Sequence, residues 1–180
     1  RTWIWVAVAL ALAGTAVLVR ARWPRWRYGR LRADPQTYEA LVSATAQRHG
    51  IPPTLVLAVI WKESRFRADA VGKAGEVGLM QITEGAVIDW KEYHARRIPP
   101  RHLWFSPELN IEIGTWYLAR AMRTWRNHRS ADILALAEYN AGPSRARRWA
   151  PEDPQRELTL DNASLLLTRE YIRQVKQKWY

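Results

Sequence analysis

Residues 52–64 read PPTLVLAVIWKES, and this stretch decides the fold. The two prolines suit the first turn of a helix, where a missing N–H group has no partner to lose. The run from Leu55 to Trp61 is almost continuously apolar, and a helix that is apolar all round is buried at the centre of a domain. The stretch therefore predicts a buried central helix from Thr54 to about Ser64.

The last turn of this helix carries a carboxyl group, that of Glu63. Partial removal of the carboxyl from water would raise its pKa, and the partial negative charge of a helix C-terminus acts in the same direction. A carboxyl that stays protonated near neutral pH suits general-acid cleavage of a glycosidic bond. The alternative from this feature alone is a solvated glutamate paired with Lys62 or Arg67.

Helical periodicity and capping signals account for most of the chain beyond residue 34. No segment alternates with period two for long, so the fold class is mainly α with at most a small sheet. Irregular connections are expected over 70–78 and 91–105, and Asn140 to Pro143 reads as a stop signal. One helix is expected to begin at Asp34-Pro35 and to stop at Gly50, and another to begin at Ser106-Pro107. The other expected helices run over 54–64, 83–90, 130–139 and 163–178.

The composition excludes several kinds of chemistry. The chain has no cysteine, which rules out disulfides, thiolate metal sites, a cysteine nucleophile and a lipoprotein anchor. Its four histidines are scattered, so no metal site is expected and no organic cofactor is implied. The formal net charge of +11 favours anionic partners, including acidic lipid headgroups and acidic polymers.

Four short blocks follow one another at spacings that carry a family resemblance. They are Glu63-Ser64, Gly78 to Gln81, Glu138 to Gly142 and Thr168 to Tyr171. In this order they resemble the catalytic domain of the soluble-lytic-transglycosylase-like family, whose relatives include goose-type lysozyme. The resemblance covers about residues 36 to 180 and implies a lysozyme-like helical domain.

The resemblance also implies a role for each matching residue. Glu63 corresponds to the single catalytic acid and base of the family, and no metal or organic cofactor takes part. The implied partners are peptidoglycan glycan strands. The residues that would bind this substrate are Ser64, Gln81, Tyr139, Asn140 and Tyr171.

The mechanism implied by the resemblance needs one carboxyl group, whereas most glycosidases use two. Glu63 would protonate the oxygen that links N-acetylmuramic acid to N-acetylglucosamine. The ionised carboxylate would then take a proton from the muramic acid C6 hydroxyl, which attacks C1. The expected product is a 1,6-anhydromuramic acid end, formed without water.

Two positions depart from the family pattern. Many members carry a serine nine residues after the catalytic glutamate, and this chain has Gly72 there. The residue before Thr168 is commonly glutamate in the family, and here it is Leu167. With Gly72 in place of the serine, support for the Glu63 carboxyl is missing or comes from elsewhere. With Leu167 in place of the glutamate, the sugar subsite that this residue would serve is in doubt.

The N-terminal segment predicts a membrane anchor. Residues 3–19 are an uncharged apolar run, near the lower limit of length for crossing a bilayer. We expect a retained transmembrane helix, with residues 1–33 as anchor and basic linker and residues 34–180 as the catalytic domain. The alternative is a cleaved signal peptide, since residues 11–13 offer a cleavage site of small residues.

The expected location is the bacterial inner membrane, with a single span and the catalytic domain in the periplasm or cell envelope. One feature opposes it, because a cluster of arginines follows the apolar run and the positive-inside rule would hold such residues in the cytoplasm. Basic residues beside a membrane also bind acidic headgroups. The cluster comprises Arg20, Arg22, Arg25, Arg27, Arg30 and Arg32.

Three other functions compete with this interpretation. A hydrolytic goose-type lysozyme would use water in place of the C6 hydroxyl. A non-catalytic scaffold would bind peptidoglycan in the same cleft. A nucleic-acid binder would use the arginines with Trp23 and Trp26, but we expect no nucleic acid partner because the arginines adjoin an apolar segment and no nucleic-acid motif follows.

Overall fold

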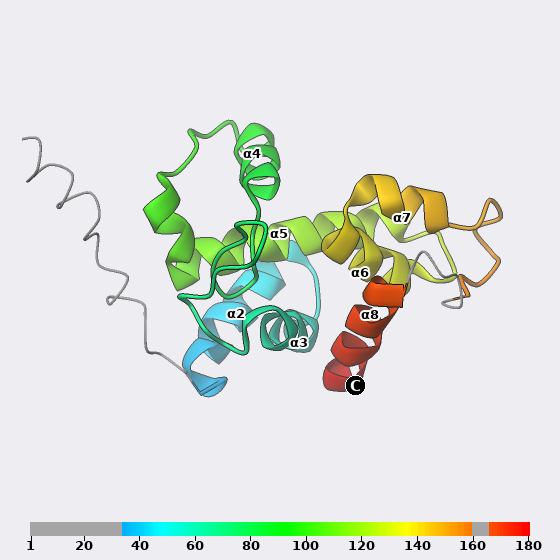
Figure 1. The fold of residues 1–180 in the computed structure, drawn as a ribbon, viewed down its shortest axis with the longest axis horizontal. Helices are drawn as coiled ribbons and strands as arrows, with labels where there is room; N and C mark the ends of the chain where they lie inside the picture. Colours follow the sequence, from blue (N-terminus) through cyan, green and yellow to red (C-terminus); the bar gives the residue numbers. More distant parts are fainter. Residues whose placement is uncertain (1–33, 160–165) are drawn as a thin grey trace, which may run out of the picture.

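The computed structural model describes residues 34–159 and 166–180, and Figure 1 shows the arrangement of their helices. The expected transmembrane helix over 3–19 and the basic linker up to residue 33 lie outside the described residues. Within the two described ranges, no helix has both the length and the apolar character needed to span a bilayer.

The described chain is mainly helical, as the sequence predicts. Across residues 34–159 and 166–180 there is no strand, and the β pairing consists of isolated bridges, among them those of Val77 with Val71 and with Ile82. The helices are α2 (Gln36–His49), α3 (Pro53–Ser64), α4 (Glu84–Tyr93), the 3-10 helix η2 (Arg101–Phe105), α5 (Pro107–Trp125), α6 (Ala131–Ala141), α7 (Pro143–Trp149) and α8 (Leu166–Trp179).

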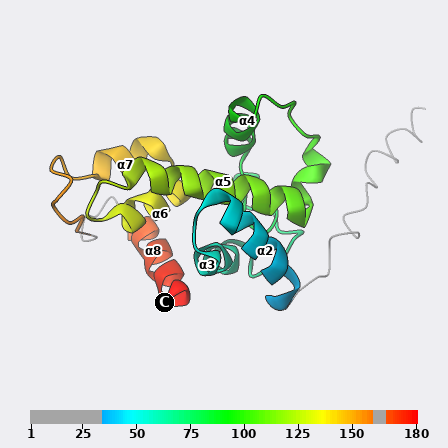
Figure 2. The same ribbon diagram turned by 180° about the vertical axis from the view of Figure 1, so that it is seen from behind.

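The long helix α5 forms the axis of the domain. It contacts α2, α4, α6 and η2, and Figures 1 and 2 show it running across the molecule from both sides. Helix α3 packs between α2 and α8, so the central apolar helix is flanked by an early and a late segment of the chain.

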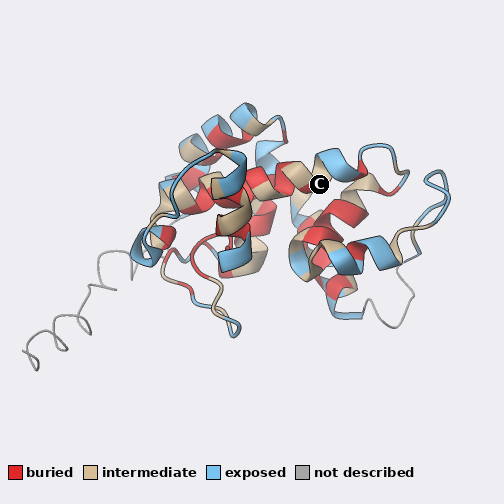
Figure 3. Ribbon diagram, turned by 90° about the horizontal axis from the view of Figure 1, so that it is seen from above, coloured by how far each residue is buried: buried red, intermediate tan, exposed pale blue. Residues whose placement is uncertain are grey.

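The core confirms the prediction of a buried central helix. Leu55, Val59 and Ile60 on α3 are fully buried, and they join a cluster that includes Leu118 on α5 and Ile172 on α8. Figure 3 shows the buried positions lying on the inner faces of the helices. Burial of several such side chains, each worth roughly 1.5–3 kcal/mol, fixes the last turn of α3 against α8.

Several predicted helix ends are confirmed by their hydrogen bonds. Gly50 ends α2 in the left-handed conformation with φ 70°. The Ser106 hydroxyl accepts a bond of 3.2 Å from the Leu109 N–H at the start of α5. The Thr83 hydroxyl likewise accepts one of 3.1 Å from the Ala86 N–H at the start of α4. These caps satisfy N–H groups that a helix start leaves without a partner.

Two segments differ from the sequence prediction. Pro143 ends one helix as expected, but it also opens α7, because a proline fits the first helical position. The connection over 91–105 is only partly irregular, since α4 continues to Tyr93 and η2 begins at Arg101. The reason lies in tertiary contacts: the buried Trp104 ring donates a hydrogen bond of 2.8 Å to the Pro99 carbonyl and orders this segment.

Candidate active site

The carboxyl of Glu63 lies at the end of α3 in surroundings that favour its protonated form. Burial raises the pKa of Glu63 to about 7 and is the largest influence on it. The Tyr171 hydroxyl and the Lys62 ammonium lower the pKa, while the charge of Glu76 raises it. Since desolvation outweighs the other effects, the carboxyl holds its proton near neutral pH, in the direction that the sequence predicts.

The chain turns sharply directly after this carboxyl. Arg65 and Phe66 both have left-handed backbone, with φ of 54° and 60°. Such conformations cost non-glycine residues on the order of 1–3 kcal/mol each and gather at functional sites. The buried Phe66 ring is stacked on Tyr38 with ring centroids 6.5 Å apart, which holds the turn in place. Helix α3 therefore ends at a fixed position beside Glu63.

The Gly78–Gln81 block forms a turn that is fixed by hydrogen bonds to the Asn110 side chain on α5. The fully buried Asn110 side chain accepts a hydrogen bond of 2.7 Å from the Met80 N–H and donates one of 2.9 Å to the Val77 carbonyl. Gly78 has φ 78°, and a Cβ there would come within 2.2 Å of the Asn110 amide nitrogen. Glycine is required at this position for both reasons.

Gln81 at the end of this turn is tied to the backbone by its amide nitrogen. The Nε2 group donates to the Gly78 carbonyl at 2.8 Å and to the Ala70 carbonyl at 3.3 Å. Its backbone is left-handed, with φ 49°. The orientation of the Gln81 side chain is therefore fixed, and its amide oxygen is directed away from these two bonds.

Tyr139 and Asn140 reach the same region from the end of α6. The Tyr139 hydroxyl donates a hydrogen bond of 2.8 Å to the Met80 carbonyl, beside Gln81. The Asn140 amide oxygen accepts one of 3.0 Å from the Thr168 hydroxyl on α8. Burial, followed by the charge of Glu63, raises the pKa of Tyr139 well above its usual range. Tyr139 thus neighbours both Glu63 and the Gly78–Gln81 turn.

Tyr171 on α8 faces Glu63 from the opposite helix. Burial raises the pKa of Tyr171 well above its usual range, and the nearby Glu63 acts in the same direction. The hydroxyl interacts with the Glu63 carboxyl, yet it completes no hydrogen bond of standard geometry with any described residue. A buried hydroxyl without a partner is uncommon and is a site where a functional partner is expected.

Ser64 is placed differently from the other predicted site residues. Its side chain is buried, and the hydroxyl donates a hydrogen bond of 3.2 Å to the Ile60 carbonyl one turn earlier in α3. This bond engages Ser64 within its own helix rather than in the cleft.

A cleft of about 220 Å³ adjoins the Gln81 turn and the end of α6. Glu63 does not line this cavity, but its charge acts on Tyr139, which does. The cleft is lined by the Gln81 turn, α4, α5 and the end of α6, and Tyr139 is the lining residue on which the charge of Glu63 acts. The lining residues are Gln81, Ile82, Thr83, Ala86, Gly114, Tyr117, Tyr139, Asn140, Ala141 and Gly142.

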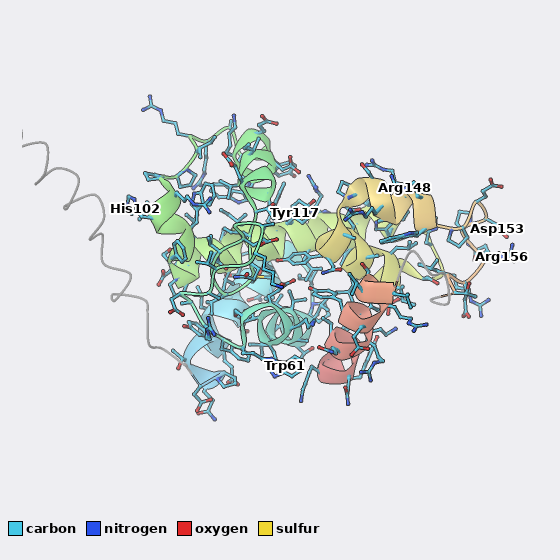
Figure 4. The ribbon with its side chains drawn as sticks, in the orientation of Figure 1. Trp61, His102, Tyr117, Arg148, Asp153 and Arg156 are labelled. Atoms are coloured by element: carbon cyan, nitrogen blue, oxygen red, sulfur yellow. The ribbon has the colours of Figure 1, made fainter. Side chains whose placement is uncertain are left out.

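Sequence reasoning missed three residues of this region. Tyr117, labelled in Figure 4 on α5, lines the cleft with its ring centroid 6.0 Å from that of Tyr139. Asn110 positions the Gly78–Gln81 turn, and Glu76 acts on Glu63. The signal for Asn110 was available, because a polar residue on the apolar face of a predicted helix demands partners. Tyr117 gave no signal beyond ordinary packing.

The described ranges, 34–159 and 166–180, contain no group of three or more His, Asp or Glu side chains arranged to hold a metal ion. The chemistry available to these residues is that of one protonated carboxyl with amide and phenol groups around it. A protonated carboxyl near neutral pH is a general acid.

The fold and this arrangement define a helical, lysozyme-like domain with a desolvated carboxyl, that of Glu63, at the end of α3. The chain belongs to the transglycosylase SLT domain family, which matches residues 40–161. It is 31% identical over 132 residues to membrane-bound lytic murein transglycosylase C of Yersinia pestis (strain Pestoides F). That match covers 69% of this chain and 37% of the relative, so the chain spans little more than a third of the relative's length.

Solved structures share the fold. An inactive mutant of the lytic transglycosylase Slt from Pseudomonas aeruginosa superimposes with a TM-score of 0.70 and 25% identity, covering 90% of this chain and 26% of that one. The 70-kDa soluble lytic transglycosylase of Escherichia coli gives a TM-score of 0.66 and 26% identity, over 79% of this chain and 23% of that one. The 70-kDa enzyme in complex with bulgecin A gives 0.65 and 26%, over 78% and 23%.

Proposed function

We propose that this domain is a lytic transglycosylase that cleaves the β-1,4 bond between N-acetylmuramic acid and N-acetylglucosamine in peptidoglycan. The observation that carries the proposal is the carboxyl of Glu63, whose pKa burial raises to about 7 beside the unpaired Tyr171 hydroxyl. Membership of the SLT family and the names of the similar proteins support the same activity.

In the first step, the protonated Glu63 gives its proton to the oxygen that leaves with N-acetylglucosamine. The bond between this oxygen and C1 of the muramic acid breaks, and the 2-acetamido carbonyl of that sugar stabilises the positive charge that develops at C1. The Glu63 carboxylate formed in this step needs stabilisation. The Tyr171 hydroxyl, which has no other partner among the described residues, is available to donate to it.

In the second step, the Glu63 carboxylate takes the proton of the muramic acid C6 hydroxyl while that oxygen bonds to C1. The product is a 1,6-anhydromuramic acid end, and Glu63 returns to its protonated state. The cycle therefore consumes no water and needs no second carboxylate, unlike the two-carboxylate glycosidases.

The surrounding residues would bind the glycan strand. Gln81 would offer its amide oxygen, because its nitrogen is already engaged by backbone carbonyls. Tyr139 and Asn140 would hold the sugar next to the scissile bond, with Thr168 orienting Asn140. Ser64 would act through the last turn of α3, where its hydroxyl bonds to the helix backbone.

We also propose that residues 3–19 anchor the protein as a single span in the bacterial inner membrane, with the domain over 34–180 in the periplasm. The length and apolar character of this run support the proposal, and so does the name of the relative, a membrane-bound murein transglycosylase. Fractionation of cells that express the chain, followed by protease treatment of spheroplasts, tests both parts. Recovery of the protein in the soluble cytoplasmic fraction would reject them.

The activity is tested by digestion of purified peptidoglycan with the wild type and with Glu63→Gln, followed by mass spectrometry of the released fragments. We expect anhydromuramic ends from the wild type and none from the variant. Asp69→Asn is the matched control, because Asp69 is a carboxylate of the following loop whose charge acts on Tyr38. Fragments heavier by one water would identify a hydrolase instead, and intact peptidoglycan would identify a non-catalytic binding domain.

A further inference from the structure

The cleft contains an aromatic ring that the proposed mechanism does not use. Tyr117 lines the cavity together with Tyr139, and their ring centroids are 6.0 Å apart in an edge-to-face arrangement (Figure 4). The Tyr117 side chain is only partly buried, so a ligand in the cleft can reach it. A tyrosine offers a broad, rigid apolar face with a polar hydroxyl at one end, which suits the C–H groups and hydroxyls of a sugar ring. Tyr117 is therefore a second aromatic residue that a bound glycan strand would contact.

The guanidinium group of Arg120 lies over the Tyr117 ring, one turn further along α5. Its carbon Cζ is 4.4 Å from the centroid of the Tyr117 ring and 5.2 Å from that of the buried Trp116 ring. A cation over the face of an aromatic ring is attracted to it, and the planar guanidinium group is well suited to this contact. Arg120 therefore restricts the orientation of the Tyr117 ring.

Two carboxylates hold the guanidinium group in turn. Its Nη1 donates a hydrogen bond of 2.8 Å to Asp89 on α4, and its Nη2 lies 3.9 Å from the carboxylate oxygen Oε1 of Glu138 on α6. Glu138 is buried, and its other oxygen, Oε2, accepts a hydrogen bond of 2.8 Å from the Trp125 indole N–H. A buried carboxylate is costly without a cation and hydrogen bonds around it, so Glu138 keeps Arg120 in place.

Both carboxylates belong to helices that line the cleft. Asp89 follows Ala86 by one turn of α4, and residues three apart on a helix lie on the same side of it. Ala86 lines the cleft. Glu138 directly precedes Tyr139, which lines it from α6. Arg120 therefore links the α4 and α6 walls of the cleft to the helix that carries the Tyr117 ring.

We propose that Arg120 is a positioning residue of the cleft: its guanidinium group holds the Tyr117 ring, between the α4 and α6 walls, in the orientation that contacts a sugar of the glycan strand. The proposal rests on the proposed function insofar as the ligand is a β-1,4-linked amino-sugar polymer. Arg120 is not among the residues that line the cleft, so it acts through Tyr117 and not by touching the sugar. Its loss should therefore weaken binding of the strand more than it slows bond cleavage at Glu63.

Affinity for a glycan tests the proposal. Binding of an oligomer of β-1,4-linked N-acetylglucosamine is measured by isothermal titration calorimetry in the Glu63→Gln background, from which the general acid is absent. Tyr117→Ala removes the ring and should raise Kd about tenfold. Arg120→Lys keeps a positive charge beside Glu138 but removes the planar group from the ring, and it should raise Kd about threefold. Arg123→Gln, at an exposed position of the same helix, is the control and should leave Kd unchanged.

A double variant decides whether Arg120 acts through the ring. If it does, adding Arg120→Lys to Tyr117→Ala raises Kd little further. Independent effects that multiply, an unchanged Kd in Arg120→Lys, or a parent protein that does not bind the oligomer would overturn the proposal. Thermal unfolding verifies that each variant is folded. Lysine is the replacement of choice because Arg120→Gln would leave the buried Glu138 carboxylate without its cation and should unfold at a lower temperature.

Activity provides a second and separate readout. With Glu63 present, Arg120→Lys should raise KM by about the same factor as Kd and change kcat less. A lower kcat with an unchanged KM would instead assign Arg120 to the stability of the fold. Because the affinity measurement does not depend on turnover, a wild type without anhydromuramic products would refute the proposed function, while the Kd values would still decide the role of Arg120.

Discussion

The Tyr139 hydroxyl donates a hydrogen bond of 2.8 Å to the main-chain oxygen of Met80, and this bond joins the end of α6 to the turn that carries Gln81. The bonded residues are 59 positions apart in the chain. The negative charge of Glu63 also helps to raise the pKa of Tyr139. The Tyr139 side chain therefore interacts both with the turn that carries Gln81 and with the Glu63 carboxyl.

Replacement of Tyr139 by phenylalanine should loosen this connection. The Met80 carbonyl would lose its donor, at an expected cost of about 1–2 kcal/mol in the free energy of unfolding, measured by denaturant titration. Release of anhydromuramic products should fall as well, because Gln81 would be less well positioned. Tyr93→Phe is the control, since that ring is 71% exposed, and it should change neither property. Equal effects of the two substitutions would contradict the role assigned to Tyr139.

Asn110 is expected to be the most sensitive polar residue of the core. Substitution by alanine would remove the partner of the Met80 N–H and of the Val77 and Trp104 carbonyls, all at a fully buried side chain. We expect a loss of roughly 3 kcal/mol or more in the free energy of unfolding. The exposed Asn127 provides the matched control, and its replacement by alanine should cost little. A small loss at Asn110 would show that water replaces these bonds.

Two helical glycines should respond in opposite directions to the same substitution. In Gly114→Ala the new methyl group would lie 2.6 Å from the Met80 sulfur and 2.7 Å from its Cβ, so α5 or the turn must shift, at a cost of about 1–3 kcal/mol. In Gly85→Ala the nearest atom is the Thr83 hydroxyl at 3.8 Å, and helix propensity should stabilise the protein by up to about 1 kcal/mol. Calorimetric melting temperatures measure both effects. A rise for Gly114→Ala would mean that the Met80 side chain moves aside freely.

The raised pKa of Glu63 leads to a prediction about the free energy of unfolding as well as about the rate. Because burial raises it from 4.5 to about 7, the folded state binds the proton more tightly than the unfolded state does. The stabilisation is fully present below about pH 4.5 and is lost as the pH rises through 7, with an upper limit of about 3 kcal/mol. Glu63→Gln should therefore be more stable than the wild type at pH 8, and the two should converge near pH 4.

Urea unfolding at several pH values measures this difference, with Asp69→Asn as the control whose difference from the wild type should not follow the same course. Activity should fall through the same range, since the deprotonated carboxyl cannot act as a general acid. A Glu63→Gln variant that is no more stable than the wild type at pH 8 would show that the carboxyl is solvated there.

Tyr171→Phe separates a catalytic effect from a structural one. The hydroxyl interacts with the Glu63 carboxyl but completes no hydrogen bond of standard geometry with any described residue, so its removal should leave the free energy of unfolding unchanged to within about 1 kcal/mol. The pKa of Glu63 should rise, because the hydroxyl lowers it in the wild type, and the alkaline limb of kcat/KM should move to higher pH. We also expect a lower kcat. Marked destabilisation with unchanged activity would assign Tyr171 to packing alone.

The fold was largely predictable because its signals are local. The apolar run of α3, the Gly50 stop and the Ser106 and Thr83 caps each follow from a few adjacent residues, and the structure confirms them. Helix α7 was not predicted because a proline such as Pro143 can end one helix or occupy the first position of the next. The neighbouring residues do not distinguish between these two possibilities. Helix η2 depends on the burial of Trp104, which is a tertiary contact.

The site was predictable only in part. The apolar surroundings of Glu63 gave the direction of its pKa, and the spacing of the blocks indicated which segments would meet. What a side chain does after the chain folds is a different matter. Whether the Ser64 hydroxyl faces its own helix, and whether Tyr171 keeps its hydroxyl unpaired, depends on rotamers and on neighbours from distant segments. The approach of the Glu76 carboxylate to Gly72 likewise depends on side-chain positions that only folding sets.

The flanking of α3 by α2 and α8 also bears on when the chemistry becomes possible during synthesis of the protein. A growing chain on the ribosome contains Glu63 long before it contains Tyr171, and until α8 is made one wall around the carboxyl is absent. Without that wall the carboxyl is more exposed to water, so its pKa lies closer to the usual value of a glutamate. A chain that stopped short of α8 would therefore lose part of the desolvation that raises the pKa of Glu63.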